Sequence, residues 1–310
     1  MLFRQLEYFV AVARERHFAR AAEACYVSQP ALSAAIAKLE RELNVTLINR
    51  GHTYQGLTPE GERLVVWAQR ILAEHDAFKA EVTAVQSGIT GTLRLGTEPT
   101  ASTTVALPVA AFCAAHPLAR VQIHSRLPTT DLARQLREFE LDAAIGPFPP
   151  EDLDGLLTVP LYEERYVLLA PEDLLRPDIR TMTWAEAAQM PLALLTEDMT
   201  IRQVLDGALA GTGVTVTAQV ETDSVASLYA HVASGEWASI VPHTWLRAMP
   251  VSGRTRAVRL VEPDARAQVL VGIHAGAPGS PIARAFADAA TGLSLDEFFD
   301  QPPGSGDRIG

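Results

Sequence analysis

The 310-residue sequence predicts an all-α N-terminal part, a long connecting helix and a C-terminal α/β part. Three observations predict this division. Apolar residues recur at helical spacing in short stretches before residue 44, a four-and-three spacing of apolar residues follows over 64–85, and short apolar runs alternate with helical stretches from residue 93 onward. The expected parts are 1–58, 59–91 and 92–299, followed by a disordered Pro-, Gly- and Ser-rich tail over 300–310.

Composition and charge limit the class of protein. Apolar residues make up 48% of the chain, and no stretch holds the roughly 18 uncharged apolar residues of a membrane span. The first residues lack an export signal, and the two cysteines, Cys25 and Cys113, lie in separate helical patterns. We therefore expect a cytoplasmic protein with no membrane contact, cofactor or metal site. Cys113 follows an apolar run and is expected to be buried, which disfavours a redox switch.

The acidic charge is confined to the C-terminal part. Residues 1–86 contain ten basic and ten acidic side chains, so the remaining 16 basic and 27 acidic side chains carry the whole net charge of −11. Residues 1–52 are mildly basic but form no strongly basic patch. Any case for DNA binding therefore depends on the residue pattern rather than on charge.

Three short helices are expected before residue 44. The first carries an apolar stripe that includes Leu6 and Phe9, and the second spans about 18–24. The third follows a break at residues 26–27, with Ser28 as its N-cap, Pro30 in its first turn and Asn44 suited to a left-handed C-cap. This is the layout of a helix-turn-helix unit, whose second member enters the major groove by its N-terminal end.

The outer face of this third helix supplies the candidate DNA contacts. Glutamine can form two hydrogen bonds with adenine and serine can contact several base edges, so Gln29 and Ser33 are the expected base readers. The alternative is that Ser28 and Gln29 only cap a helix in an unrelated bundle. The full candidate set for DNA contact is Ser28, Gln29, Pro30, Ser33, Ala34, Lys38, Arg41 and Arg50.

The N-terminal 62 residues resemble the signature of the LysR-type transcriptional regulators. The matching residues are Ala21, Ala22, Val27, Ser28, Gln29, Pro30, Ala31, Leu32, Ser33, Ile36, Leu39, Glu40, Leu43, Leu47, Arg50, Thr58, Pro59, Glu60 and Gly61. The resemblance implies a winged helix-turn-helix that binds double-stranded DNA sequence-specifically, in a bacterial regulator that is not an enzyme. The departures are Cys25, Asn44 and Ile48, where Leu, Gly and Phe are usual.

A further departure concerns charge near the DNA. The family often carries basic residues at the positions of Ala34, Ala35 and Ala37, and in the wing at 51–56. Because each phosphate contact adds to the dependence of affinity on salt, we expect a shallow salt dependence for this chain.

A heptad pattern marks the long helix that begins after Thr58. Its expected seam is Leu64, Ala68, Ile71, His75, Phe78, Val82 and Val85. This seam predicts a homodimer, although a helix lying on its own domain's core is the alternative. The resemblance implies the same dimer, with two recognition helices about one DNA turn apart, and the tetramers common in the family lead us to expect one here. His75 either fixes the register or responds to pH.

Strands and helices alternate in the remainder, which predicts a mainly parallel sheet with ligands beyond its carboxyl ends. The expected strands are 93–96, 121–125, 143–146, 166–170, 192–195, 214–220, 239–241 and 269–273. The resemblance adds a periplasmic-binding-protein-like domain in which lobe I (92–162 and 268–299) and lobe II (163–267) face each other across a cleft. Such a cleft suits a small-molecule effector.

Loops after the strands supply the candidate effector-binding residues, which are Thr100, Ser102, Thr129, Phe148, Thr200 and Arg202. Hydroxyls and helix N-termini attract anions, and Arg202 would be the charge partner of an anionic effector. Glu98 and Glu221 oppose that interpretation. The alternatives are that each Thr or Ser is an ordinary N-cap and that Arg202 forms a surface ion pair.

Two other classes of protein remain to be weighed. An enzyme is not expected, because the sequence has no nucleophile elbow, zinc-binding His-Glu-x-x-His, Gly-rich phosphate loop or dinucleotide fingerprint. A periplasmic solute-binding protein would fit 92–292 alone, but it would need the missing signal peptide. The expected mechanism is that an effector closes or reorients the two lobes, and that the linker helices pass this change to the paired recognition helices.

Overall fold

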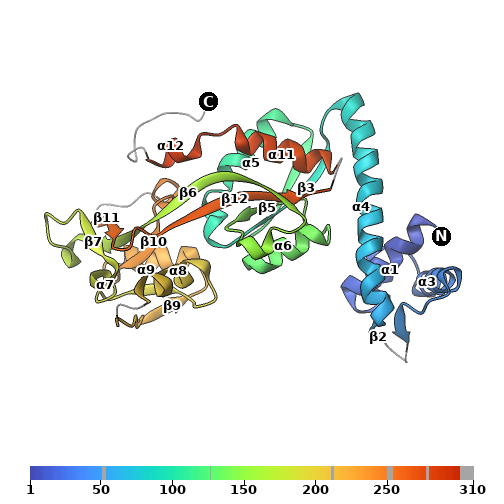
Figure 1. The fold of residues 1–310 in the computed structure, drawn as a ribbon, viewed down its shortest axis with the longest axis horizontal. Helices are drawn as coiled ribbons and strands as arrows, with labels where there is room; N and C mark the ends of the chain where they lie inside the picture. Colours follow the sequence, from blue (N-terminus) through green and yellow to red (C-terminus); the bar gives the residue numbers. More distant parts are fainter. Residues whose placement is uncertain (51–53, 126, 211–212, 250–253, 277–278, 301–310) are drawn as a thin grey trace.

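Three helices and a two-stranded sheet form the N-terminal part of the computed structural model (Figure 1). They are α1 (Phe3–Glu15), α2 (Phe18–Ala24), α3 (Gln29–Leu43), β1 (Ile48–Arg50) and β2 (Tyr54–Leu57). The structure describes residues 1–50, 54–125, 127–210, 213–249, 254–276 and 279–300. The predicted tail from 301 onward and residues 51–53 of the predicted wing lie outside this range.

The predicted helix ends are confirmed. The hydroxyl of Ser28 accepts a hydrogen bond from the Ala31 amide at 3.4 Å, and Asn44 ends α3 with a left-handed φ of 53°. Leu32, Ile36 and Leu39 are fully buried on the inner face of α3. The apolar stripe therefore fixes which face of α3 packs and which face remains outside.

The long helix α4 (Pro59–Ser87) begins where predicted, with the Thr58 hydroxyl accepting from the Gly61 amide at 2.9 Å. Gly61 is required there because a Cβ atom would collide with the backbone oxygen of Leu47. Only part of the predicted dimer seam is exposed and available to a second helix. Leu64 and Ala68 pack into the core of the N-terminal part, whereas Phe78, Val82 and Val85 are exposed. The alternative interpretation thus holds for the first turns of the helix.

The C-terminal part combines one large sheet, a small sheet and flanking helices. In chain order the elements are β3 (Gly91–Thr97), η1 (Thr100–Thr103), α5 (Ala106–Ala115), β4 (Ala119–His124), α6 (Thr129–Arg137), β5 (Ala143–Gly146), η2 (Pro150–Asp152), β6 (Leu156–Pro171), η3 (Glu172–Leu174), β7 (Thr181–Thr183), α7 (Trp184–Ala187), β8 (Ala193–Leu195), α8 (Thr200–Leu209), β9 (Val220–Thr222), α9 (Val225–Ala233), β10 (Ser239–Pro242), α10 (Trp245–Ala248), β11 (Thr255–Val261), β12 (Arg266–His274), α11 (Pro281–Thr291) and α12 (Leu295–Asp300).

The large sheet is mixed rather than mainly parallel. Its strand order is β4-β3-β5-β12-β6-β11-β7, with β10 also paired to β6. β3 pairs in parallel with β4 and β5, but β12 runs antiparallel to both β5 and β6, and β10 and β11 run antiparallel to β6. The prediction was wrong here because the order of strands and helices along the chain does not fix the direction in which β12 and β10 pair, and because β11 and the first half of β6 were not recognised as strands.

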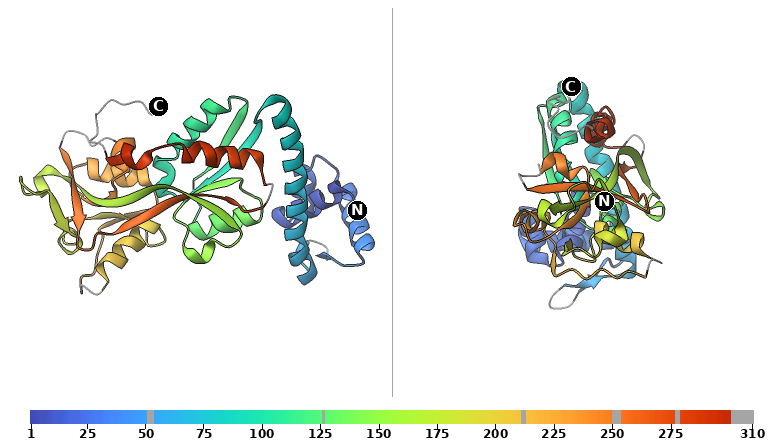
Figure 2. Two further views of the ribbon diagram at one scale, coloured as in Figure 1. Left: turned by 45° about the horizontal axis from the view of Figure 1, so that its top comes forward. Right: turned by 90° about the vertical axis from the view of Figure 1, so that its left-hand side faces the viewer.

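Two lobes are joined by the long strands β6 and β12, which run across both in Figure 1. The core of lobe I includes Leu95, Phe112 and Phe286, and that of lobe II includes Leu168 and Trp184. The left view of Figure 2 shows the same division, with α4 standing between lobe I and the helix-turn-helix. Among the described residues, no helix is long and apolar enough to cross a membrane.

Two further predictions for the C-terminal part were wrong. Only Val220 of the predicted strand 214–220 lies in a strand, although Val214 and Val216 pack on the lobe II core. The alternation of apolar residues there reflects side-chain packing on the lobe II core outside a regular strand. Cys113 is exposed rather than buried, because α5 is apolar nearly all round and it is Phe112 and Pro108 that turn inward.

Candidate functional site

The N-terminal end of α3 presents an uncharged polar surface. Gln29, Pro30 and Ala34 are exposed and Ser33 is half-buried, while the Ser28 hydroxyl is engaged in capping. These side chains have no role in the core, which is made by the opposite face of α3. The surface can therefore offer hydrogen-bond donors and acceptors to base edges at little cost to the fold.

The cations near this surface are few and partly engaged. The Lys38 Nζ lies 3.9 Å from a Glu42 carboxylate oxygen, and the Arg41 Nε donates to the Ala37 carbonyl at 3.3 Å. Both side chains are exposed, so either can turn toward a phosphate. Arg50 lies in β1, and its side chain is outside the described part of the chain.

Tyr26 also belongs to this surface, although it was predicted only as part of the break between two helices. It lies in the turn before α3, is 96% exposed, and has a left-handed φ of 56°. A bulky side chain at such a φ carries backbone strain, which marks the position as a candidate contact residue. The signal in the sequence was a large aromatic residue in a turn that favours Gly or Asn.

An apolar strip lies along the outside of α4. It consists of Trp67, Ile71, Phe78, Val82 and Val85, whose exposed fractions range from 36% to 81%. His75, predicted within the seam, instead stacks on Phe3 of α1 with ring centroids 4.0 Å apart. His75 therefore helps to fix α1 against α4 in the same chain.

The two lobes meet at a small set of residues that we name the lobe junction: Glu98, Thr100, Glu164, Thr244 and Trp245. The Trp245 indole of lobe II donates to the Thr100 carbonyl of lobe I at 3.0 Å. The Thr244 hydroxyl donates to Glu164 Oε1 at 3.5 Å. Every side chain of this set is at least nine-tenths buried, so the lobes are in direct contact here.

Two carboxylates are buried at the lobe junction. Glu98 is 2% exposed, and burial raises the pKa of its carboxyl group, against hydrogen bonds from the Thr100 and Thr200 hydroxyls. Burial, reinforced by the negative charge of Glu98, raises the pKa of Glu164 to about 8. The Glu98 Oε1 atom has no hydrogen-bond partner among the described residues. Buried carboxyl groups of this kind are typical of binding sites.

The structure brings together some of the predicted effector-binding residues and separates others. Thr100 and Thr200 meet at Glu98, and the Ser102 hydroxyl donates to the Pro99 carbonyl one turn away. Thr129 is the first residue of α6 and forms no hydrogen bond to the junction within the part of the chain that the structure describes. Glu98 and Glu164 were missed as site residues, because only the fold reveals that they are buried together.

Two of the predicted residues have structural partners of their own. The Phe148 ring packs in a lobe I cluster with Leu132 and Leu136, against Gly272. Arg202 is buried and faces three carboxylates, with Glu221 at 2.7 Å, Asp206 at 3.4 Å and Glu197 at 3.7 Å. The ion-pair alternative therefore describes Arg202, whose charge is already balanced.

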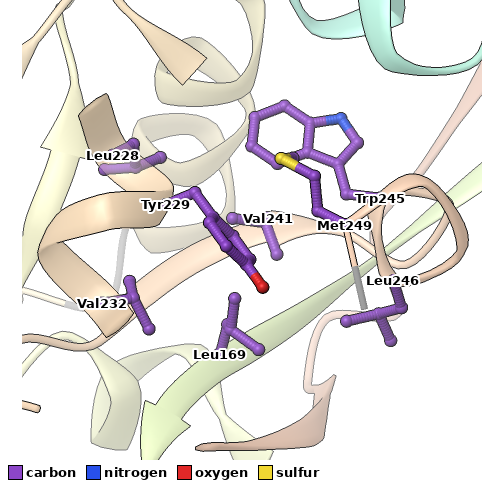
Figure 3. A pocket seen from close by; sticks show the side chains of 8 residues that line it. All are labelled: Leu169, Leu228, Tyr229, Val232, Val241, Trp245, Leu246 and Met249. Atoms are coloured by element: carbon purple, nitrogen blue, oxygen red, sulfur yellow. The ribbon is translucent and has the colours of Figure 1, made fainter. Parts of the chain in front are cut away.

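Two cavities are present, one outside the lobe junction and one that borders it at Trp245. A groove of about 900 Å³ runs between α4 and lobe I and is lined by residues that include Gln69, His124 and His274. A second cavity of about 10 Å³, scarcely room for one water, lies within lobe II beside Trp245 and Tyr229 (Figure 3). Its apolar lining identifies it as a packing gap rather than a ligand site.

Comparison with known proteins identifies both parts of the chain. Residues 3–62 match the family described as bacterial regulatory helix-turn-helix protein, lysR family, and residues 86–293 match the LysR substrate binding domain. A probable hydrogen peroxide-inducible genes activator of Streptomyces viridosporus is 32% identical over 88% of each chain. The SDS degradation transcriptional activation protein of a Pseudomonas species is 32% identical over 97% of this chain and 98% of its own.

A solved structure has the same arrangement of parts. Full-length OxyR from Pseudomonas aeruginosa, a cysteine-to-aspartate variant, is 27% identical, covers 95% of this chain and 99% of its own, and has a TM-score of 0.76. The fold predicted from the sequence, a helix-turn-helix followed by a two-lobed domain, is thereby confirmed.

Proposed function

Because the chain belongs to the LysR family of DNA-binding transcriptional regulators, we propose that it acts as a homodimer whose paired α3 helices read two DNA half-sites. The observation that carries this proposal is the outward face of the α3 N-terminus, where Gln29 and Ser33 have no partner role in the core. Ser28, Pro30 and Ala34 complete the base-facing set. Lys38, Arg41 and Arg50 supply the phosphate contacts.

The apolar strip on α4 supports the dimer. Trp67 is 59% exposed and Phe78 is 70% exposed, on a helix whose Leu64 and Ala68 pack into the chain's own core. Large aromatic side chains left on a helix surface favour pairing with a second helix, and they commonly dominate the binding energy. We further propose that dimers pair into a tetramer, as is common in the family.

We place the effector site at the lobe junction, with Thr100, Ser102 and Thr200 around it and Thr129, at the start of α6, as an outer contact. An effector that binds there alters how the lobes meet, since Trp245 and Thr244 of lobe II contact lobe I and β6 at this point. Lobe I then acts on α4, because Arg284 of α11 forms an ion pair with Glu81 of α4 at 3.0 Å. The chain thus acts by ligand binding and not by catalysis, in the cytoplasm where the DNA lies.

Because one relative is named a probable hydrogen peroxide-inducible genes activator, a peroxide-sensing thiol has to be considered for this chain. A thiol sensor needs a reactive thiolate, and this chain has only Cys25 and Cys113. Burial raises the pKa of the Cys25 thiol, which lies in the helix-turn-helix. Cys113 is on the outer side of α5, away from the junction. These positions favour an effector that binds without thiol chemistry.

Footprinting of the purified protein on DNA from its own upstream region tests the reading role of α3. The wild type is expected to protect a site of two half-sites about one helical turn apart, and a Gln29→Ala, Ser33→Ala double variant is expected to lose this protection while keeping the unfolding midpoint of the wild type. Glu23→Gln, on the exposed side of α2, is the control. Equal protection by the double variant would refute the assignment of the reading residues.

A further inference from the structure

The Glu98 carboxyl group at the lobe junction accepts hydrogen bonds from the Thr100 and Thr200 hydroxyls and from backbone amides, but one of its two oxygens lacks a donor among the described residues. Oε2 of Glu98 accepts from the Thr100 hydroxyl, but its Oε1 is fully buried and has no partner within the described residues. Glu164 has only a long contact of 3.5 Å from Thr244. A buried acceptor without a donor is costly, so it marks a place where a ligand group can supply the missing hydrogen bond.

Among the described residues that act on the ionisation of these two carboxyl groups, none is basic. The groups that shift the pKa of Glu164 are Glu98 and Thr244, and no basic side chain is among them. The charged and titratable groups that face the pair are the two carboxyl groups themselves and the phenols of Tyr162 and Tyr166. Arg202, the cation expected from the sequence to hold an anion, is engaged with Glu221, Asp206 and Glu197. An anionic effector would therefore find no cationic partner among the groups that act on these carboxyl groups.

Aromatic residues are buried in the same region as these carboxylates. Burial and the negative charges of Glu164 and Glu98 raise the pKa of the Tyr162 phenol, whose oxygen is 2.6 Å from Thr104 Oγ1. Trp245 closes the junction from lobe II. Carboxylates combined with aromatic faces favour an organic cation, because ring faces attract ammonium and guanidinium groups. Among the described residues no set of His, Cys, Asp and Glu side chains could hold a metal ion.

We propose that the lobe junction binds a small organic cation, an ammonium or guanidinium compound, through Glu98 and Glu164, with Thr100 and Thr200 beside it. This inference rests on the proposed effector role of the junction and reverses the charge that the sequence suggested. The cation enters when the lobes part, and its N–H groups take up the free Glu98 oxygen and replace Trp245 as the link between the lobes.

Proton release should accompany this binding. Glu164, with a pKa of about 8, is mostly protonated at pH 7 when the site is empty. A bound cation stabilises the ionised carboxylate and lowers its pKa, so about one proton leaves for each cation that binds at pH 7. A ligand that merely fills space between the lobes would release none.

The test is thermal denaturation and calorimetry of the full-length protein without DNA. The probes are benzylamine, butylamine and agmatine, with benzoate and butyrate as carboxylates of matched skeleton. We expect at least one amine to raise the melting temperature by several degrees and neither carboxylate to do so. Calorimetry at pH 7 in two buffers of different ionisation enthalpy is expected to show proton release.

Matched variants separate binding at the junction from a general charge effect. Glu98→Gln keeps the size of the side chain and is expected to weaken amine binding at least ~10-fold. Glu236→Gln removes the same charge from an exposed position of lobe II and is expected to leave amine binding unchanged. If Glu98→Gln does not fold, Thr200→Val, which alters the rim of the junction, takes its place.

Each outcome has a definite meaning. Stabilisation by none of the amines, equal stabilisation by the carboxylates, or equal amine binding by Glu98→Gln overturns the proposal. If the carboxyl groups only share a proton, Glu98→Gln alters the pH dependence of stability but no amine binds, which also overturns it. If an amine binds without altering the DNA footprint, the cation site stands and the proposed effector role fails.

Discussion

The N-terminus of α3 and the lobe junction are both candidate binding surfaces, but their residues are held in opposite ways. At α3, uncharged polar side chains such as Gln29 point outward, and the helix is stabilised by its buried opposite face. At the junction, Glu98 and Glu164 are buried and the lobes close over them. Side chains of the first surface can be replaced without disturbing the packing of the fold, whereas those of the second are part of that packing.

This difference predicts different consequences of substitution. A change on the outer face of α3 alters DNA affinity with little effect on stability, because surface substitutions away from caps and cores are usually within ~0.5 kcal/mol. A change at the junction alters stability, pH dependence and ligand binding together. The five predictions that follow challenge this contrast, from the largest expected effect to the smallest.

Glu164→Gln should change the pH dependence of folding most. The pKa of Glu164 is about 8 in the folded chain against 4.5 for an unfolded one, so the folded state holds an extra proton between these values and stability falls as pH rises. The shift corresponds to at most ~5 kcal/mol at pH 9. Urea denaturation of the variant at pH 5, 7 and 9 is expected to show a flatter profile. A profile as steep as that of the wild type would show that Glu164 is ionised and solvated.

The dependence of DNA affinity on salt tests how few phosphates are neutralised. With Lys38, Arg41 and Arg50 in each protomer, a dimer makes about six phosphate contacts and log K falls with log salt at a slope of about −5. Affinity is then expected to fall ~1,000-fold between 50 and 200 mM salt. Fluorescence anisotropy measures the slope, and a value that requires ten or more ion pairs per dimer would contradict the account.

Phe78→Glu tests the apolar strip of α4. A charge at the 70% exposed Phe78 is expected to leave the fold of the protomer intact but weaken dimerisation by ~2 kcal/mol or more. Sedimentation velocity should show dissociation to monomers and a corresponding loss of DNA affinity. Glu62→Gln, exposed near the start of the same helix, is the control. A variant that remains dimeric at low micromolar concentration would place the dimer contact elsewhere.

Gln29→Ala tests base reading alone. The loss of one bidentate contact is expected to cost ~1–3 kcal/mol in specific binding and to leave non-specific binding unchanged. Competition between the operator and unrelated DNA measures the affinities of specific and non-specific binding separately. A uniform loss on both DNAs would make Gln29 a backbone contact.

Tyr26→Gly tests the strained turn. Because Tyr26 has a φ of 56°, glycine should relieve strain, and its own entropy cost limits the gain in stability to about 1 kcal/mol or less. If the ring contacts DNA, affinity falls while stability rises. Asn44→Gly, at the similar φ of 53°, is the matched control for stability. Loss of stability in Tyr26→Gly would mean that the ring packs within the fold.

The sequence predicted the helix-turn-helix closely because its signals are local. Ser28, Thr58 and Asn44 each act on the helix beside them, so spacing along the chain was sufficient. The lobe junction was not predicted, because Glu98 and Glu164 lie 66 positions apart and meet only through the fold. Exposure of Cys113 and the pairing of β11 were missed for the same reason, since a uniformly apolar helix or a short strand does not specify its neighbours.

The most direct test of the whole account is the DNA footprint of Glu98→Gln without any effector. If the lobe junction governs how the recognition helices are presented, removing its buried charge is expected to change the extent of protection, while Glu236→Gln protects as the wild type does. Identical footprints and affinities for wild type, Glu98→Gln and Glu236→Gln would contradict the claim that the junction communicates with DNA.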